Sequence, residues 1–495
     1  MKIERFLPAA CAALMLAGAA AQAPPMTTQV ASRLTANGLK ADVSFLASDA
    51  LQGRGTPSPG LDIAAEFVAA QFRRAGLEPA GDDGYFQTAP YANVTPDLDR
   101  LELSLEIAGK TIQVEKNAMT LGDAAALDLN RAAALKVPAD NADIDALQPD
   151  AVRGKVLIVD VPAAGRRTRI PPSTLERLRP ALLVTLLPSS GGRMGPSASR
   201  LQESSPAIVP AIAVWDTAVR DALAEAKSGP LEATVSAKIP APAVAPVKLR
   251  NVIGVLPGSD PALKGTYVLI TAHYDHLGVR GAGEGDHIYN GANDDASGTA
   301  SVIEIANALG ALPARPKRSI VFVALFGEEL GLLGSRYYAA HPVFPLAQTI
   351  ADLNLEQMGR TDDNTGPRVG LVNVTGYDFT TLTPELKKAG DEFGIRVEKD
   401  EQNSEPFYAR SDNQAFADAG VPAHTLSVGY IFPDYHRPGD EWPKIDYDNM
   451  AKVDCAVALA IFRIADSPDA PRWNAANPKT APYVKAREGA GRSNR

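Results

Sequence analysis

Residues 319–329 read SIVFVALFGEE, an apolar run that ends in a glycine and two adjacent glutamates. Isoleucine, valine and phenylalanine bounded by a glycine are typical of a buried strand, so we predict one over 319–325. Two neighbouring carboxylates at the end of such a strand repel each other unless positive charge compensates them. Their side chains point in different directions, so one can bind a metal ion while the other faces a water molecule. The alternative is that both glutamates lie on the solvated start of a helix.

The sequence around this run alternates strand and helix signals from residue 251 onward. Strands are expected at 267–271, 319–325, 350–355 and 423–428, and helices at 297–309, 330–339, 382–393 and 447–465. This alternation predicts an α/β fold with a mostly parallel central sheet flanked by helices. Ligands of such sheets bind beyond the carboxyl ends of the strands. The polar residues that follow these strands are therefore the first candidates for a functional site.

A separate, smaller β-rich α/β module is expected between residues 110 and 247, where short apolar runs alternate with proline and glycine. It contains no histidine, which favours a lid or docking role over a catalytic one. The Pro/Ala-rich stretch 240–246 predicts a linker after it. The expected organisation has five parts: a leader at 1–23, the N-terminal part of the main domain at 24–109, the insert at 110–247, the main domain at 248–467 and a flexible tail at 468–495. Within this tail, Trp473 and Tyr483 could dock on the rest of the protein.

The first 23 residues have the pattern of a secretory signal peptide. Lys2 and Arg5 precede an apolar stretch over 6–21, and Ala21-Gln22-Ala23 has the small-x-small form of a cleavage site, with 19–21 as a rival site. The alternative is an N-terminal membrane anchor. The apolar stretch is only about 16 residues long and contains Pro8, whereas a spanning helix needs about 20 residues. We therefore expect export to the periplasm or the medium, with no stable membrane insertion after cleavage.

The composition excludes several classes of protein. With 45% hydrophobic and 22% charged residues among 495, the chain fits neither a collagen, a coiled coil nor a disordered protein. Its formal net charge of −9 argues against nucleic acid as a partner, because a phosphate backbone is bound by clustered lysine and arginine. Of the two cysteines, Cys11 lies in the leader, so no disulfide framework is expected, and the helical spacing around Cys455 predicts a buried thiol.

Histidines and carboxylates recur where the predicted strands end. All six histidines fall between residues 273 and 436. Asp275 follows His273 at a spacing that lets its carboxylate hold the second ring nitrogen of a metal-bound imidazole. In the segment NGANDDASG at 290–298, Asp294 is the candidate for a bridging carboxylate, whereas Asp295 and Ser297 are expected to cap the following helix.

Two histidines and three carboxylates form the expected metal set: His273, Asp294, Glu329, Glu356 and His436. With Asp294 shared, each of two zinc ions has one histidine and two carboxylates and keeps a position for water. Two metals about 3.5–4 Å apart can clamp the attacking and leaving oxygens of a hydrolysis. Glu328, next to this set, could then shuttle a proton.

The remaining polar candidates receive a structural interpretation. His276 and His287 are expected in solvent-facing loops, the alternative being that they line the cleft. His341 is expected at a helix terminus and His424 packed in a strand. Ser411 and Asp412 are expected to cap a helix, the alternative being that they face a substrate.

Five motifs in order resemble the co-catalytic di-zinc aminopeptidase family, which also contains glutamate carboxypeptidase and the non-catalytic transferrin receptor. They are AHYDHLG at 272–278, NGANDDASG at 290–298, FGEELGLLGS at 326–335, NLEQMGR at 354–360 and DYHRPGDE at 434–441. The stretch 45–86 resembles the N-terminal part of these peptidases. More loosely, 110–247 is similar to the protease-associated domain often inserted in them.

The resemblance implies roles for the matching residues. His273, Asp294 and Glu356 would hold one zinc, and Asp294, Glu329 and His436 the other. Glu328 would be the general base, Asp275 would orient His273, and Tyr435 would stabilise the oxyanion. Glu356 departs from the family, in which aspartate is commoner at this position.

The implied function is that of a secreted zinc exopeptidase acting on peptides with a free N-terminus. Alternatives are a carboxypeptidase or a glutaminyl cyclase on the same fold, or a non-catalytic binding module on this scaffold. The cyclase reaction needs only one zinc, so the number of bound ions distinguishes it.

Overall fold

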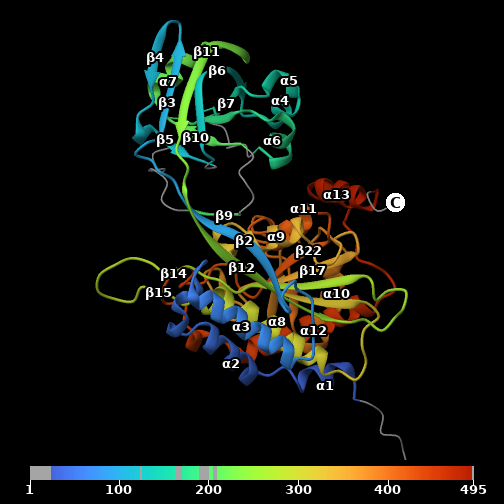
Figure 1. Ribbon diagram of the computed structural model, residues 1–495. Helices are drawn as coiled ribbons and strands as arrows, with labels where there is room; N and C mark the ends of the chain where they lie inside the picture. The colour runs from blue at the N-terminus through green and yellow to red at the C-terminus, as the bar shows by residue number, and fades with distance from the viewer. Residues whose placement is uncertain (1–23, 123–124, 163–169, 189–199, 204–208, 493–495) are drawn as a thin grey trace, which may run out of the picture. The chain divides into compact units, whose positions relative to one another are not determined.

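The computed structural model describes residues 24–122, 125–162, 170–188, 200–203 and 209–492 (Figure 1). These residues form two compact units, one made of the chain up to Gln87 together with Asn251 onward, and the other of Thr88–Arg250. The inserted unit is therefore longer at its N-terminal side than the expected 110–247. The predicted signal peptide lies outside the described residues. None of the helices within the described ranges is long and apolar enough to cross a membrane.

The first unit is built on a mostly parallel sheet, as predicted. Its strands run in the order β21-β20-β22-β17-β13-β16-β12. Their bounds are β12 Ala243–Leu256, β13 Tyr267–His273, β16 Ser319–Leu325, β17 Thr349–Leu355, β20 Leu371–Val374, β21 Arg396–Glu398 and β22 Ala423–Ser427. The pairs β13–β16, β13–β17 and β17–β22 are parallel, and β12 joins β16 antiparallel. The central strands are buried along their whole length, because helices cover both faces.

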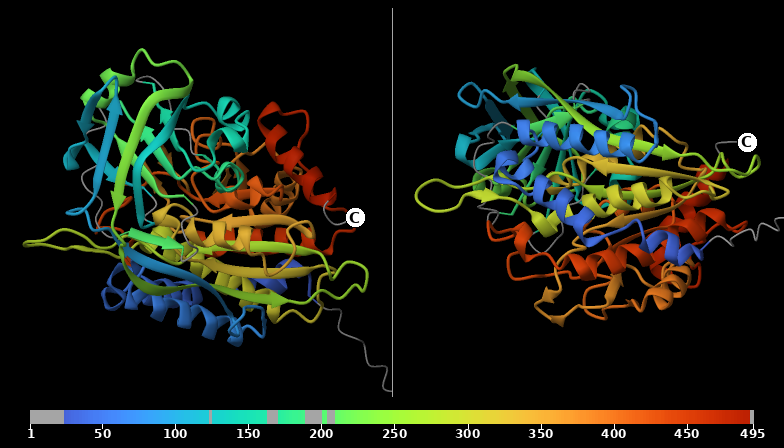
Figure 2. Two further views of the ribbon diagram at one scale, coloured as in Figure 1. Left: turned by 45° about the horizontal axis from the view of Figure 1, so that its top comes forward. Right: turned by 90° about the horizontal axis from the view of Figure 1, so that it is seen from below.

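Helices pack on the two faces of this sheet (Figures 1 and 2). On one face, α8 (Gly298–Gly310) contacts the strands and is itself covered by α2 (Ala36–Leu46), α3 (Pro59–Arg74) and α12 (Tyr447–Asp466). Helix α10 (Leu382–Phe393) packs against α12, and Cys455 on α12 is buried as expected. Helices α9 (Leu333–Ala340) and α11 (Asn413–Asp418) contact each other, and α11 contacts β17 and β22. The α/β fold class is therefore confirmed.

Helix α9 begins three residues later than the predicted start at 330. Gly331 and Leu332 both have left-handed backbone conformations, with φ of 97° and 63°. A right-handed helix cannot include such residues, so Glu328–Leu330 forms a separate short turn, η4. The two adjacent glutamates therefore lie on a tight turn at the strand end.

The inserted unit has a sheet of its own, in the order β4-β3-β11-β6-β7-β8-β10-β5. The strands are β3 Glu102–Ile107, β4 Lys110–Gln113, β5 Met119–Leu121, β6 Leu127–Pro138, β7 Val156–Asp160, β8 Leu182–Leu186, β10 Ala211–Val214 and β11 Gly229–Ile239. Leu103, Ile158, Val184 and Val235 are among the buried side chains of its core. The expected linker at 240–246 is only partly a linker, because β12 already begins at Ala243.

The C-terminal residues are more ordered than the expected flexible tail at 468–495. Residues Ala481–Arg492 form helix α13. The ring of Trp473 is 9% exposed, stacks on Tyr483 at a centroid distance of 4.9 Å and donates its indole N–H to the carbonyl of Gly420. Packing of these two aromatic rings holds the segment on the first unit. The prediction of a flexible tail is therefore wrong for its described part, whereas the predicted docking of the two rings is observed.

Candidate active site

The candidate residues gather at the carboxyl ends of three parallel strands. His273 is the last residue of β13, Glu328 and Glu329 follow β16, and Glu356 directly follows β17. In the β13–β16 ladder, His273 lies opposite Leu325. Parallel strands place their carboxyl ends at one edge of a sheet, which is why residues more than 80 positions apart meet there.

Asp294 joins this edge from the turn Ala292–Ser297, which precedes α8. Its backbone is held in place by Asp440, whose carboxylate accepts from the amides of Asn293 and Asp294 at 3.0 Å. One carboxylate oxygen of Asp294 lies 3.3 Å from His273 Nε2. Potential ligand atoms of His273, Asp294 and Glu356 all lie within 4.8 Å of one another, so this group can hold a metal ion.

The other oxygen of Asp294 faces a second group. It lies 3.1 Å from His436 Nε2, and the same nitrogen lies 3.3 Å from Glu329 Oε1. His276, Asp294 and Glu329 also have potential ligand atoms within 4.8 Å of one another. The structure therefore brings together all five residues of the expected metal set and adds His276.

The two groups fit divalent cations. His273 Nε2, Asp294 Oδ2 and Glu329 Oε1 are buried atoms that have no hydrogen-bond partner. Two ligand atoms that each lie about 2.0–2.1 Å from a zinc ion are about 2.8–3.4 Å apart when the ligand angle is 90–110°. The distances of 3.1–3.3 Å that join Asp294 to His273 and His436, and His436 to Glu329, fall in that range. Imidazole nitrogens with carboxylate oxygens are the donors that zinc prefers.

The pKa shifts at the site also indicate that its carboxylates need compensating positive charge. Burial disfavours the charged imidazolium of His436, but Asp294 and Glu329 outweigh it and raise the pKa of His436 to about 10. For His273, burial is likewise outweighed by Asp275 and Asp294, which raise its pKa well above the usual value. Burial raises the pKa of Glu356 to about 7. Without a metal ion, the negative charge of the crowded carboxylates is thus compensated by protonation or by protonated imidazoles. A bound cation would supply the positive charge instead.

Asp275 connects the first group to its surroundings. Its carboxylate lies 3.5 Å from His273 Nδ1 and accepts hydrogen bonds from the Glu328 amide and the Thr56 hydroxyl, each at 3.1 Å. It is completely buried. This position, on the far nitrogen of the His273 ring, is the one expected of a residue that orients a metal-ligating histidine.

Glu328 and Tyr435 lie beside the two groups. Burial raises the pKa of Glu328 well above its usual value, and Glu356 and Glu329 add to the effect. The ring of Tyr435 stacks on that of His436 at a centroid distance of 4.0 Å, and burial raises the pKa of its phenol. Glu328 can therefore hold a proton, and Tyr435 keeps its hydroxyl proton as a donor.

Several other polar residues differ from the expectation. His276 is 1% exposed, so the prediction of a solvent-facing loop residue is wrong; the loop after β13 folds back under the segment around Gly291. Ser411 does not cap a helix: its hydroxyl accepts from Asn354 Nδ2 at 2.8 Å and bonds to Glu356. Asp412 does not cap α11 either, and instead accepts a hydrogen bond from Ser335.

The remaining predictions for single residues have mixed outcomes. Asp295 accepts from the Gly298 amide at the start of α8, as expected, whereas Ser297 makes no capping bond to α8 and donates to the carbonyl of Asn293. His341 is exposed at the end of α9, and His424 is buried in β22, both as expected. His287 is partly exposed.

Arg54 is the functional-site residue that sequence reasoning missed. It is completely buried, and its guanidinium donates to the carbonyls of Tyr274, Asn290 and Gly291 at 2.8, 2.8 and 3.0 Å, and also to that of Leu46. These carbonyls flank the loops that carry His273 and Asp294. The short string Gly-Arg-Gly at 53–55 is the only local signal, and it is too common to identify such a residue.

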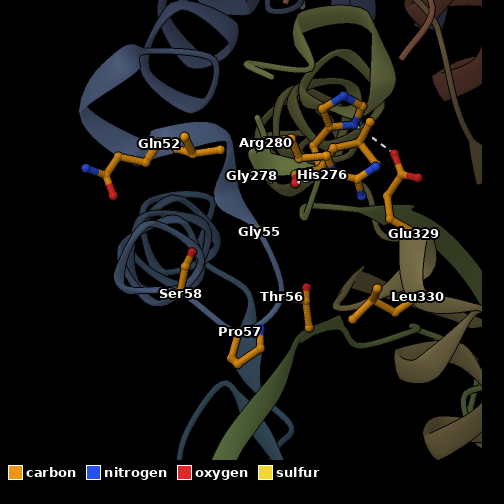
Figure 3. A pocket seen from close by; sticks show the side chains of 12 residues that line it. Gln52, Gly55, Thr56, Pro57, Ser58, His276, Gly278, Arg280, Glu329 and Leu330 are labelled. Carbon is orange, nitrogen blue, oxygen red and sulfur yellow. Dashed lines mark hydrogen bonds and ion pairs between the residues drawn. The ribbon is translucent and has the colours of Figure 1, made fainter. Parts of the chain in front are cut away.

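A pocket with a volume of about 350 Å³ opens beside the second group (Figure 3). Figure 3 shows Glu329 and His276 on one side of it and the segment from Gln52 to Ser58 on the other, with Arg280 also in its lining. This pocket provides room for a ligand next to Glu329.

Fold and site together define a class: an α/β protein in which histidines and carboxylates that can hold metal ions gather at the end of a parallel sheet. Residues 251–461 match the model of peptidase family M28. Aminopeptidase YwaD of Bacillus subtilis is 26% identical over 211 residues, which are 41% of this chain and 42% of that protein. A probable zinc metalloprotease of Leptosphaeria maculans is 31% identical over 262 residues, 46% of this chain and 60% of that protein.

The chain thus spans about half the length of the curated relatives that it matches. Among solved structures, an aminopeptidase from Aneurinibacillus sp. strain AM-1 superposes with a TM-score of 0.51 at 20% identity, covering 90% of this chain and 97% of that chain. This likeness concerns the fold and agrees with the predicted α/β class.

Proposed function

We propose that this protein is a zinc-dependent aminopeptidase that uses two zinc ions to remove N-terminal residues from peptides. The observation that carries the proposal is the carboxylate of Asp294, which faces His273 with one oxygen and His436 with the other. Such a shared carboxylate is what a pair of neighbouring cations requires. The family match and the relatives named as an aminopeptidase and a zinc metalloprotease support the same class of reaction.

In the proposed assignment, His273, Asp294 and Glu356 hold one ion, and Asp294, Glu329 and His436 hold the other. When bound, zinc lowers the pKa of water and polarises the carbonyl of the scissile bond. Asp275 keeps the ring of His273 in the orientation that presents Nε2 to the site, with its backbone carbonyl 3.2 Å and its carboxylate 3.5 Å from Nδ1.

Glu328 is the general base of the proposed reaction. It accepts a proton from the attacking water and returns it to the leaving amine. The burial that raises its pKa favours the protonated intermediate state of this side chain. The Tyr435 hydroxyl donates a hydrogen bond to the carbonyl oxygen as that oxygen gains negative charge.

The proposed substrate is a peptide with a free N-terminus, whose ammonium group is attracted by the carboxylates of the site. Export of the protein, directed by the predicted signal peptide at 1–23, belongs to the same proposal, as does a role of the Thr88–Arg250 unit as a protease-associated-like accessory module. A carboxypeptidase, a glutaminyl cyclase and a binding module remain the alternative functions.

The test is release of p-nitroaniline from leucine p-nitroanilide and from its N-acetylated form, with zinc and then with a chelator. We expect chelator-sensitive cleavage of the free-amine substrate alone. Cleavage of neither substrate by a zinc-loaded protein would contradict the aminopeptidase proposal and favour one of the alternatives. A stoichiometry of one zinc per chain would favour the cyclase.

A further inference from the structure

His276 is a buried histidine at the candidate site that the family motifs leave without a role. It lies three residues after His273, in the loop that follows β13, and it is 1% exposed. Its Nδ1 lies 2.8 Å from Glu329 Oε1, an interaction drawn in Figure 3. The inference below rests on the proposed function, because it concerns how the second cation would be held.

The contact between His276 and Glu329 does not have the geometry of a hydrogen bond. Although the two atoms are 2.8 Å apart, His276 Nδ1, His276 Nε2 and Glu329 Oε1 are all buried atoms without a hydrogen-bond partner. Such atoms are costly to bury unless something satisfies them. Two ligands of one zinc ion are about 2.8–3.4 Å apart and direct their lone pairs at the ion rather than at each other. His276 Nδ1 and Glu329 Oε1 have this arrangement.

The backbone beside His276 leaves room for its ring. Gly291 has a φ of 57°, and a Cβ added there would lie 2.4 Å from His276 Cγ and 2.5 Å from Cδ2. The ring therefore rests directly on the backbone of the loop that carries Asp294. Its edge also faces His436, with ring centroids 5.7 Å apart and an interplanar angle of 72°. Packing thus holds the imidazole in place without a hydrogen bond.

We propose that His276 is an additional ligand of the second cation. That cation is then held by His276, His436, Asp294 and Glu329, and the first by His273, Asp294 and Glu356. Because it has four protein ligands against three, the second site binds zinc more tightly than the first. The two sites consequently fill in sequence, and dialysis against a weak chelator removes the first ion before the second.

The test compares H276A with wild type by calorimetric zinc titration of the metal-free proteins and by metal analysis after dialysis. H287A is the matched control, because His287 is a partly exposed histidine of the same region that lies outside both groups. We expect two zinc ions of unequal affinity in wild type and in H287A. In H276A the affinity of the tighter site should fall by at least about 100-fold, while that of the weaker site is unchanged. Removing a residue that only hydrogen-bonds to a ligand lowers metal affinity by about 10–100-fold, so a larger loss indicates direct ligation.

A second measurement uses the wild-type chain and does not depend on how the variant folds. In the protein loaded with cobalt(II), each ligating histidine gives a paramagnetically shifted ring N–H signal. Three such signals are expected, from His273, His276 and His436. Two signals, or an unchanged tight affinity in H276A, would overturn the inference and leave the proposed function standing. Wild-type protein that binds no zinc would overturn the proposed function instead.

Discussion

Glu328 and Glu329 are neighbours in the chain, but their surroundings shift their pKa values in opposite directions. Burial raises the pKa of Glu328 well above its usual value. Glu329 is also affected by burial and by Asp294, yet His276 and His436 outweigh both and lower its pKa to about 2. One glutamate is therefore suited to carry a proton and the other to remain a charged ligand. Both lie on the turn Glu328–Leu330, and of the two only Glu329 belongs to a candidate ligand group.

Replacing Glu328 by glutamine tests this division. E328Q keeps the size and burial of the side chain but cannot accept a proton, so turnover should fall by about 10²–10⁴-fold. Zinc content should stay at the wild-type value, because Glu328 is not in either candidate ligand group. The measurements are turnover of leucine p-nitroanilide and metal analysis of the same sample. Wild-type turnover in E328Q would refute the assignment of the base.

At the scale of elements, Arg54 joins three parts of the first unit. It lies in the turn Asp49–Arg54 and donates to the carbonyls of Tyr274, after β13, and of Asn290 and Gly291, before α8. Asp275, Asp440, Asp295 and Asp294 all lie near enough to favour its charge, although burial still lowers its pKa to about 10. The N-terminal segment thus holds the two loops that carry His273 and Asp294.

Removal of this side chain should destabilise the first unit. In R54A, buried carbonyls lose their donors at about 1–3 kcal/mol each, so we expect the free energy of unfolding to fall by at least about 3 kcal/mol. The control is R153A, at an exposed position of the other unit. Denaturant unfolding of the metal-free proteins measures the difference. A loss below about 1 kcal/mol in R54A would show that the carbonyls find other partners.

A second buried ionisable side chain lies where α8 contacts α12. Asp454 on α12 is completely buried and accepts one hydrogen bond, from the Ser301 hydroxyl of α8 at 2.8 Å. Its other oxygen has no partner. Burial raises its pKa from 3.8 to about 8, with Glu304 adding to the effect. Asp454 is therefore protonated in the folded protein at neutral pH.

This protonation predicts how stability changes with pH. Between pH 3.8 and about 8 the folded state holds a proton on Asp454 that the unfolded state has lost, so the free energy of unfolding falls as pH rises through that window. D454N should remove this contribution and flatten the fall, leaving the part due to other carboxyl groups whose pKa burial raises, among them Asp42 and Glu356, each to about 7. D448N, at an exposed position of the same helix, is the control. Thermal unfolding at several pH values provides the measurement, and parallel curves for D454N and wild type would contradict the prediction.

At the scale of the whole molecule, the chain folds into two units with separate cores. Leu103, Ile158 and Val235 belong to a core of the Thr88–Arg250 unit, and Leu269 and Val321 to one of the other unit. All candidate metal ligands lie in the first unit. Metal binding should therefore stabilise one unit directly and the other not.

Calorimetric unfolding with and without a chelator tests this independence. We expect two transitions, of which only that of the first unit moves to lower temperature when zinc is removed. Zinc at 100 times its Kd would stabilise that unit by about 2.7 kcal/mol. In W215F the remaining tryptophans, Trp442 and Trp473, lie in the first unit, so fluorescence identifies its transition. A single transition that shifts as a whole would show that the two units unfold together.

The parallel α/β frame and the residues that meet at its edge follow from patterns in the amino-acid sequence. Strand and helix periodicity is a local property, and the strands β16 and β17 and helix α10 lie within a residue of their predicted bounds. Parallel pairing then places His273, Glu329 and Glu356 together, because all three lie at or just after the carboxyl ends of strands. Helix starts were less predictable, since left-handed residues such as Leu332 carry no clear sequence signal.

Which of the other polar residues belong to the site depends on tertiary contacts. Arg54 reaches the carbonyl of Asn290 across 236 positions of sequence, and Ser411 bonds to Glu356. His276 is buried because its ring rests on Gly291. Trp473 and Tyr483 hold the C-terminal segment for a similar reason. These roles depend on contacts between distant segments, and no local pattern of residues encodes them.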